Sequence, residues 1–348
     1  MKKNIVLYLL IAVLFIWNFY LSTRSSDPST TTYVNEVTVQ GFSTDLTKVY
    51  ADNASKVVTI SAGDIIQSGM VYSQSGESVY ILSCYHGIAN YDEYDVLFGE
   101  TYSAKGNMLG YDIYTDIAVL EVNTPYTIDS VTLGDATLLK QGEFVLSAGT
   151  AGSLDYIGSL ELGIVSLNHT VLDNSITYDG NPYNYFIDVI SFTSNLRSGY
   201  SGSPLFNMDG QVVGISTMSS SNTRFAVTVN EAKIIADSII SGNPVNRNNL
   251  GIKVSFIKDL MNYEKSNLGL SIDYINGAYV KDVKEGSVMS LLGIQTGDII
   301  LSVNDINVDD FDSYLSAVYL DTTEFSVNYI RDGVTGTLSL SRTNDQSN

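Results

Sequence analysis

Short apolar runs of β type dominate the chain between about residues 37 and 228. They are rich in β-branched residues and are separated by Gly, Asn, Asp and Ser; examples are 56–60, 79–83, 117–122, 144–148 and 211–217. Because no amphipathic helix separates them, the pattern predicts an all-β barrel or sandwich.

The hydrophobic period changes near residue 230. Between Asn230 and Ser241 the apolar residues approximate a helical stripe, made by Ala232, Ile234, Ile235, Ile239 and Ile240. Gly242-Asn243-Pro244 ends this helix, because proline cannot continue it and restricts the residue before it. We therefore expect a domain boundary between residues 242 and 248.

The remaining sequence, from Leu250 to Arg342, mixes both periods and predicts a small α+β domain. Its expected elements are strands at 279–283 and 298–303, a helix at 309–320 and strands at 325–330 and 337–341. Asp309 or Asp310 is the expected N-cap of the helix. The last two strands flank Asp332-Gly333, a hairpin signal, although their spacing predicts a connection longer than two residues.

The N-terminus carries an apolar run from Ile5 to Leu21, broken only by Asn18 and preceded by Lys2 and Lys3. As a helix it would span about 25 Å, the short end of what crosses a bilayer. We predict a transmembrane signal anchor over residues 1–21, a flexible Ser/Thr-rich tether over 22–48, and export of the remainder. The alternative is a cleaved signal peptide, although no small-residue cleavage site follows the run.

Charge and cysteine content exclude several classes of protein. The net charge is −20 and the pI about 4.2, which argues against a general nucleic-acid binder, since such a protein needs Lys and Arg to neutralise phosphate. One cysteine and two histidines exclude an internal disulfide framework and a cysteine-rich metal centre. We expect neither a metal nor a cofactor.

Three separated segments carry residues that together suit acyl transfer. In the segment 81–87 a strand ends and delivers His86 at its tip, Asp116 opens a continuous apolar run, and Ser201 lies in a glycine-rich turn. A serine hydroxyl is a weak nucleophile until a base takes its proton, and an acid must orient that base. The sequence therefore predicts Ser201 as nucleophile, His86 as general base and Asp116 as the orienting acid.

Glycines frame the predicted nucleophile. Gly199 and Gly202 allow a tight turn in which backbone amides can point at a developing oxyanion. The amides of Gly199 and Ser201 are the expected donors. Each motif alone also fits an ordinary turn or surface residue; their order and local context together favour catalysis. We expect His169 to be packed or superficial and Cys84 to be a small buried residue.

These segments resemble the HtrA (Deg) family of trypsin-like serine proteases with one C-terminal PDZ domain, over roughly residues 54–342. S-C-Y-H-G around His86 is similar to T-N-x-H-V, and residues 112–120 are similar to D-x-x-T-D-x-A-V-L. Residues 199–205 are similar to G-N-S-G-G-P-L, and 286–300 to a PDZ segment, G-S-P-A-x-x-A-G-L-x-x-G-D-x-I.

The resemblance implies a mainly β fold: a chymotrypsin-like double β-barrel over 49–242 and an α+β PDZ domain over 249–343. It implies an endopeptidase that acts on misfolded or signalling proteins outside the cytoplasm and needs no cofactor. The membrane-anchored type, a homotrimer and regulation by peptide C-termini are further implications. Cleavage after small or medium aliphatic residues is the expected specificity.

A PDZ domain captures a peptide C-terminus by adding it as a strand and holding its carboxylate with backbone amides. The expected carboxylate-binding loop is Asn249, Leu250, Gly251 and Ile252. The alternative is an ordinary glycine turn before a strand.

Two departures from the family motif surround Ser201. Tyr200 stands where the family has asparagine, and its ring is expected to alter the oxyanion loop or the approach of substrate. Ser203 stands where it has a second glycine, which keeps a glutamyl preference open. These departures also leave open a second function, a catalytically silent chaperone or peptide-binding scaffold.

Overall fold

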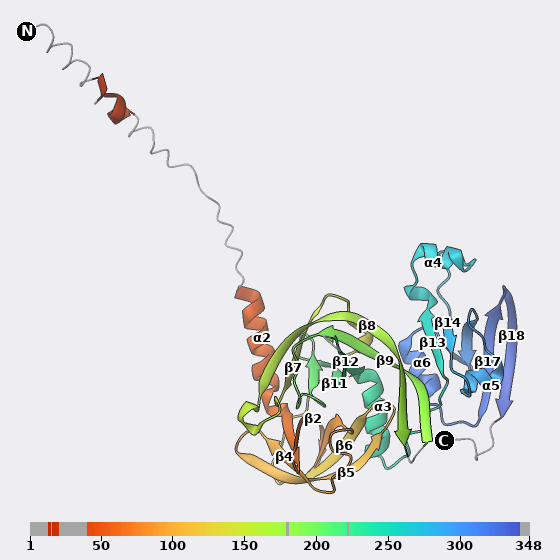
Figure 1. The fold of residues 1–348 in the computed structure, drawn as a ribbon, viewed down its shortest axis with the longest axis horizontal. Coiled ribbons are helices and arrows are strands. Elements are labelled where there is room, and N and C mark those ends of the chain that lie inside the picture. Colours follow the sequence, from red (N-terminus) through yellow and green to blue (C-terminus); the bar gives the residue numbers. More distant parts are fainter. Residues whose placement is uncertain (1–12, 15, 21–39, 179–180, 221–222, 342–348) are drawn as a thin grey trace, which may run out of the picture. The chain divides into compact units, whose positions relative to one another are not determined.

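The computed structural model describes residues 13–14, 16–20, 40–178, 181–220 and 223–341 (Figure 1). The chain forms two units, residues 1–44 and 45–348. The second contains two closed six-stranded barrels followed by a smaller sheet. The predicted mainly β, chymotrypsin-like fold is therefore confirmed.

The first barrel has the strand order β1-β2-β3-β6-β5-β4, all antiparallel. Its strands are β1 (Val57–Ala62), β2 (Ile65–Ser75), β3 (Ser78–Cys84), β4 (Tyr94–Phe98), β5 (Tyr102–Asp112) and β6 (Ile117–Asn123), preceded by a 3-10 turn, η1 (Ala54–Lys56). Inward-facing residues such as Ile60, Ile81 and Leu120 are fully buried and form one cluster. This core fixes the ends of β3 and β6, from which the site is built.

The second barrel has the order β10-β11-β12-β9-β8-β7. Its strands are β7 (Phe144–Gly149), β8 (Ser159–Tyr178), β9 (Asn181–Thr193), β10 (Pro204–Phe206), β11 (Val212–Ser220) and β12 (Thr223–Thr228); η2 (Ala136–Leu138) and η3 (Leu154–Tyr156) are 3-10 turns. β8 and β9 form a long curved hairpin (Figure 1). The turn between β9 and β10 carries Ser201.

Two helices flank the barrels. α3 (Val229–Ile240) agrees with the predicted helix; Thr228 caps it, and Ala232 and Ile235 are buried. α2 (Gln40–Asn53) was not expected, because the flexible tether was predicted to extend to residue 48. The helix forms because it docks: Val49 is buried in the large core, and the Tyr50 hydroxyl donates to the Gly158 carbonyl at 3.1 Å.

The third sheet has the order β13-β14-β15-β17-β18, with β16 paired to β15. Its strands are β13 (Ile252–Phe256), β14 (Ala278–Val283), β15 (Ile299–Val303), β16 (Ile306–Asn307), β17 (Glu324–Arg331) and β18 (Val334–Ser341). Its helices are η4 (Ile257–Asp259), α4 (Asn262–Asn267), α5 (Val288–Leu292) and α6 (Phe311–Val318). Phe311 and Leu315 of α6 pack against Val280, Ile300 and Phe325 of the sheet, as the α+β prediction requires.

The β17–β18 hairpin corrects one detail. The connection was expected to exceed two residues, but Arg331 pairs directly with Val334, which leaves only Asp332 and Gly333 in the turn. Their φ values are +51° and +76°. A two-residue turn with both φ values positive has the twist that matches the flanking strands, and Asp-Gly tolerates it.

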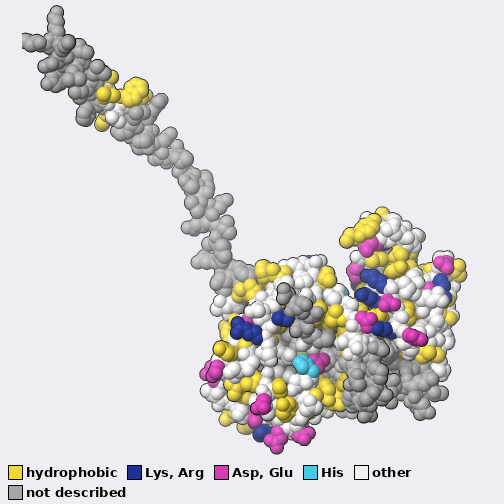
Figure 2. All heavy atoms as spheres, viewed as in Figure 1, with side chains coloured by type: hydrophobic (Ala, Val, Ile, Leu, Met, Phe, Trp, Pro, Cys, Tyr) yellow, Lys and Arg dark blue, Asp and Glu magenta, His cyan; other side chains and the backbone are white. Residues whose placement is uncertain are grey.

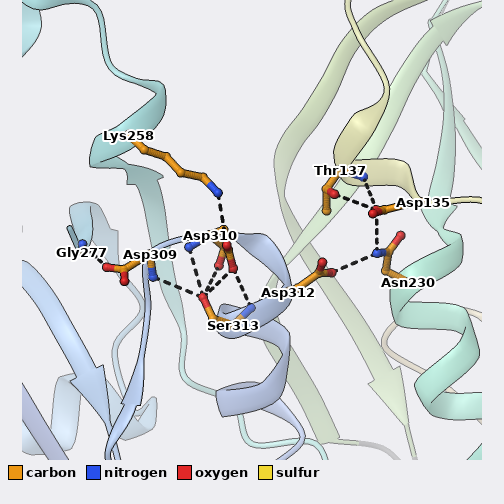
Figure 3. A network of polar contacts seen from close by, with 9 residues as sticks. All are labelled: Asp135, Thr137, Asn230, Lys258, Gly277, Asp309, Asp310, Asp312 and Ser313. Carbon is orange, nitrogen blue, oxygen red and sulfur yellow. Dashed lines mark hydrogen bonds and ion pairs between the residues drawn. The ribbon is translucent and has the colours of Figure 1, made fainter. Parts of the chain in front are cut away.

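Asp310 is the N-cap of α6 (Figure 3). Its carboxylate accepts from the Ser313 amide at 2.9 Å and from the Lys258 ammonium at 3.2 Å. Asp309, the other predicted candidate, accepts instead from the Gly277 amide at 2.6 Å. Since helix amides at an N-terminus lack internal partners, this cap fixes where α6 begins.

A buried polar cluster joins the segment after α3 to the third sheet. Arg247 forms an ion pair with Glu231 of α3 and donates to the Tyr319 hydroxyl at 2.7 Å, and Tyr319 donates to Glu231 at 2.8 Å. The two charged side chains are only 10% and 1% exposed. The charges of Arg247 and Glu231 therefore neutralise each other in a site that is largely shielded from water.

Most of the predicted anchor, residues 5–21, lies outside the described residues, as do residues 22–39 of the tether. Residues 13–14 and 16–20 are helical, and Ile16, Trp17 and Phe19 expose large apolar side chains. None of the described helices is both long enough and apolar enough to span a bilayer.

Candidate active site

His86 and Asp116 lie in direct contact where β3 and β6 pair. His86 Nδ1 and Asp116 Oδ2 are 2.5 Å apart, and Asp116 Oδ1 accepts from the His86 amide at 2.7 Å. The Tyr85 amide also donates to the Asp116 carbonyl at 2.8 Å. Two predicted residues that are thirty positions apart in the sequence are thus held by both side chain and backbone.

The backbone of Asp116 is unusual. Its φ is +63°, in the left-handed region that aspartate tolerates better than most residues. This conformation closes the turn before β6 and presents both carboxylate oxygens to His86. An aspartate at this position serves the turn as well as the side-chain contact.

Thr217 completes the environment of the carboxylate and was not among the residues predicted from the sequence. Its hydroxyl donates to Asp116 Oδ2 at 2.6 Å from β11 of the other barrel. Thr217 belongs to the predicted run 211–217, but neither its spacing nor its neighbours indicate a polar role. Only the meeting of the two barrels reveals it.

The pKa of the His86 imidazole is raised above its ordinary value. The hydrogen bond to Asp116 is the largest cause, and the Asp116 charge adds to it, while burial acts in the opposite direction. The Asp116 side chain is 17% exposed and the imidazole 53%. The pair therefore consists of a shielded carboxylate and a half-exposed imidazole.

Ser201 lies in a turn anchored to both barrels. The Ser68 amide donates to the Ser201 carbonyl at 3.0 Å, and the Gly202 amide donates to the Ser216 carbonyl at 2.8 Å. A β-carbon on Gly202 would collide with the Ser68 carbonyl and lie 2.9 Å from the Cys84 amide. Glycine is needed there because the turn packs against the end of β3, two residues from His86.

The structure thus brings His86 and Asp116 into contact and seats the Ser201 turn against the strand that delivers His86. Among the described contacts, no hydrogen bond joins the Ser201 hydroxyl to the imidazole. Hydrogen bonds of catalytic groups are often long without substrate and shorten in the complex.

The predicted oxyanion donors lie in the same turn. Gly199 has a φ of +97°, and a β-carbon there would collide with the Thr150 carbonyl. Its own carbonyl accepts from the Ser68 hydroxyl at 2.7 Å. Within the described part of the chain, the amides of Gly199 and Ser201 donate to no other group. They are suited to an external acceptor.

Both departures from the family motif are buried. Tyr200 is only 2% exposed, so its ring does not obstruct the approach of a substrate. Ser203 is fully buried, and its hydroxyl lies 2.8 Å from that of Ser147 on β7. Neither side chain is presented to a ligand, and Ser203 gives no structural support to a glutamyl preference.

The predicted carboxylate-binding loop leads into β13, the end strand of the third sheet. Gly251 has a φ of +63°, and a β-carbon there would collide with the Ser287 side chain. The carbonyls of residues 249, 250 and 251 accept from the amides of residues 288, 289 and 284. The loop is therefore fixed from one side, and the glycine is required by its geometry.

Comparisons with known proteins agree with this architecture. Residues 67–215 match the trypsin-like peptidase domain, and residues 279–324 match the PDZ domain. The chain is 28% identical over 320 residues to the serine protease Do-like HtrA of Lactococcus lactis subsp. cremoris, which covers 86% of this chain and 77% of that protein. The chain contains a trypsin-like peptidase domain followed by one PDZ domain, and its relatives are named HtrA serine proteases.

Other relatives and solved structures agree. The Bacillus subtilis serine protease Do-like HtrB is 28% identical over 288 residues, covering 79% of this chain and 62% of that protein. The HtrA-type protease AlgW with tripeptide is similar in fold, with a TM-score of 0.59 at 22% identity, covering 85% of this chain and 95% of the other. AlgW with decapeptide has a TM-score of 0.55 at 21% identity, with 85% and 97% covered.

Cys84 also lies close to the pair of His86 and Asp116: the potential ligand atoms of Cys84, His86 and Asp116 are all within 4.8 Å of one another. Burial raises the pKa of the Cys84 thiol, which lies 3.2 Å from the Ser216 carbonyl. A protonated thiol is a poor metal ligand, and the Nδ1 atom of His86 is already engaged. Cys84 acts here as the small buried residue that was expected.

His169 lies elsewhere, on the long β8–β9 hairpin. Its ring packs on Phe311 with centroids 4.9 Å apart, and its Nδ1 atom lies 3.2 Å from the Asp188 carboxylate. This position agrees with the expectation that His169 is a packed histidine.

Charged side chains are interspersed with apolar and neutral ones on the face that Figure 2 shows. Acidic groups lie both on the barrels and on the PDZ domain there. On this face the acidic residues are thus spread out rather than gathered at one site.

Proposed function

We propose that this protein is an endopeptidase of HtrA type with Ser201 as nucleophile, His86 as general base and then acid, and Asp116 as the orienting acid. The observation that carries the proposal is the 2.5 Å contact between His86 Nδ1 and Asp116 Oδ2, next to the glycine-framed Ser201 turn. A second nitrogen, Nε2, is then left for the serine hydroxyl.

The reaction follows from these positions. His86 Nε2 takes the hydroxyl proton as Ser201 Oγ attacks the scissile carbonyl, and the amides of Gly199 and Ser201 stabilise the oxyanion. The imidazolium gives its proton to the leaving amine, which leaves an acyl-enzyme. Water, deprotonated by His86, then attacks the ester and regenerates Ser201.

Asp116 contributes through the imidazolium. Its carboxylate fixes the tautomer with the proton on Nδ1 and stabilises the positive charge that forms during attack. The Thr217 hydroxyl and the His86 amide hold the carboxylate in place. The raised pKa of His86 reflects the same stabilisation of the protonated imidazole by Asp116.

The PDZ domain binds peptide or protein, and we propose that it binds C-termini. The peptide would add along the outer edge of β13, with its carboxylate at the amides of the 249–252 loop. The edge position of β13 and the fixed carbonyls of the loop support this.

We further propose that residues 5–21 anchor the chain in a membrane, with the protease and PDZ domains outside the cytoplasm. The apolar sequence and the exposed apolar side chains of Ile16, Trp17 and Phe19 support an anchor, with a cleaved signal peptide as the alternative. Misfolded or signalling proteins are the proposed substrates, and a homotrimer is the proposed assembly.

The test is digestion of a denatured protein by the full chain, with Ser201→Ala as the matched control. We expect fragments from the wild type alone, and mass spectrometry of their ends gives the residue before each cut. Suppression of aggregation that Ser201→Ala retains, with no cleavage by either form, would instead support the scaffold function.

A further inference from the structure

Hydrogen bonds from Ser68 hold the turn that carries Ser201 at the residues before and after Tyr200. The carbonyl of Gly199 accepts from the Ser68 hydroxyl, and that of Ser201 accepts from the Ser68 amide. Tyr200 is itself bonded at both backbone ends: its amide donates to the Arg197 carbonyl at 3.3 Å, and its carbonyl accepts from the Ser203 amide at 2.9 Å. The two proposed oxyanion donors, the amides of Gly199 and Ser201, belong to the residues on either side of Tyr200 in the sequence.

The side chain of Tyr200 leaves this turn for the interior. It is among the largest fully buried side chains of the described chain, with 2% exposure. Ser159 and Glu161, near the start of β8, lie close enough to affect its pKa, which burial raises to about 12. Ser159 and Glu161 alternate with exposed Leu160 and Leu162, so the phenol lies against the inward face of β8.

We propose that Tyr200 is a positioning residue that anchors the Gly199–Ser201 turn, and thereby aims the amides of Gly199 and Ser201 at the oxyanion. Its ring fills buried space between the turn and β8, so the turn cannot rotate without withdrawing a large side chain from the interior. Asparagine, which the family motif has here, is too small to fill that space. The proposal rests on the proposed triad and deepens it.

The kinetic test compares Tyr200→Phe, Tyr200→Leu and Tyr200→Ala in the full chain. Phenylalanine keeps the ring, so kcat should stay within about threefold of wild type. Alanine removes the anchor, and kcat should fall about 100-fold, as for loss of one oxyanion donor, with KM little changed. Affinity for a peptidyl boronate, whose tetrahedral adduct uses the same donors, should fall in parallel. Leucine should lie between, and it is measured in place of alanine if alanine prevents folding.

The matched control is Phe192→Ala, which removes a fully buried ring of the same barrel that is not part of the Gly199–Ser201 turn. It should lower the melting temperature as much as Tyr200→Ala does, yet leave kcat per folded molecule within about threefold. An equal loss of kcat in both variants would overturn the proposal, because the effect would then be general destabilisation.

A second measurement separates the anchor from the chemistry. In a Ser201→Ala background, amide hydrogen exchange at residues 200, 202 and 203 reports the bonds of the turn without turnover. Tyr200→Ala should speed this exchange about tenfold, and Phe192→Ala should not. Unchanged exchange would overturn the proposal. If Tyr200→Ala speeds the exchange as expected but the wild type cleaves no substrate, the role of Tyr200 in holding the turn stands and the proposed protease function is rejected.

Discussion

At the scale of single residues, the site depends on how one carboxylate is held. Asp116 has a left-handed backbone and gives one oxygen to the His86 amide and the other to His86 Nδ1 and Thr217. The two partner residues, His86 and Thr217, come from segments of different barrels. The orientation of the base is thus a property of the junction between the two barrels.

Replacing Thr217 by valine removes one hydrogen bond to Asp116 without changing the size of the side chain. We expect kcat to fall about tenfold, because a hydrogen bond to a charged group is worth about 1.5 kcal/mol. Without the Thr217 hydrogen bond, the Asp116 carboxylate should stabilise the protonated imidazole more strongly and raise the pKa of His86. The acid limb of the kcat/KM profile should therefore move to higher pH. An acid limb that stays in place would contradict this role for Thr217; Thr217→Ser is the control that keeps the bond.

The pH profile of kcat/KM should report His86. Because Asp116 raises the pKa of His86, its imidazole stays protonated to a higher pH than usual, and activity should be lost as pH falls through a midpoint above 6.5. Asp116→Asn should lower that midpoint and reduce kcat about 10⁴-fold. A flat profile between pH 5 and 8 in the wild type would be inconsistent with His86 as base.

The sequence predicted His86, Asp116 and Ser201 because each sits in a local pattern, a strand end or a glycine turn. It could not predict Thr217, because an isolated threonine within a strand carries no local signal. The possibility that the Tyr200 ring alters the approach of substrate was wrong, because the ring is buried. Whether a bulky side chain enters the interior or faces the substrate depends on space between β8 and the turn, which the motif does not encode.

At the scale of elements, caps and turns set where helices and strands begin and end. The predicted position of α6 was correct to within two residues at each end, since Asp310 carries the capping signal. α2 was missed because its helix-forming residues are ordinary, and its stability comes from docking of Val49 and Tyr50. The two-residue length of the β17–β18 turn was missed because residue propensities do not define where strands end, and both strands extend further towards the turn than predicted.

Asp310→Ala should lower the free energy of unfolding of the PDZ domain by about 1 kcal/mol, because it removes the N-cap of α6. Asp310→Asn keeps a capping oxygen and should stay close to the wild type. Bonds to Ser313 and Lys258 outweigh burial and lower the pKa of Asp310. Its ionic contribution is therefore present above its ordinary value of 3.8 and lost as pH falls through the lowered one.

Chemical denaturation of the full chain, followed at several pH values, checks this prediction. Equal losses for alanine and asparagine would show that the cap contributes nothing and that the charge alone matters.

At the scale of the whole molecule, the sequence pattern predicted a β barrel or sandwich followed by an α+β domain, because the hydrophobic period changes near residue 230. The two barrels were expected only from the family resemblance, and the sequence did not separate them. It gave no sign of how Glu231, Arg247 and Tyr319 meet. These residues are spread over α3, the following segment and the end of α6, and they form one buried cluster. Contacts between distant segments follow from packing, which local patterns do not describe.

Arg247→Ala should lower the free energy of unfolding by about 3 kcal/mol, because it leaves Glu231 buried without its cation. Burial already raises the pKa of Glu231 against the effect of Arg247, so the variant should recover part of its stability as pH falls and Glu231 becomes neutral. The control is Lys48→Ala, which breaks an exposed ion pair with Asp52 and should cost less than about 1 kcal/mol. Similar losses from both would refute the buried pair as a major contact.

The central claim is that Ser201, His86 and Asp116 act as one catalytic unit. A fluorophosphonate probe with mass-spectrometric mapping tests it most directly, because the reagent labels only a serine activated by its base. The account predicts one adduct, on Ser201, in the full chain at pH 8, with labelling abolished by Ser201→Ala and slowed at least about 10³-fold by His86→Ala. An adduct on another residue, or equal labelling rates without His86, would contradict it.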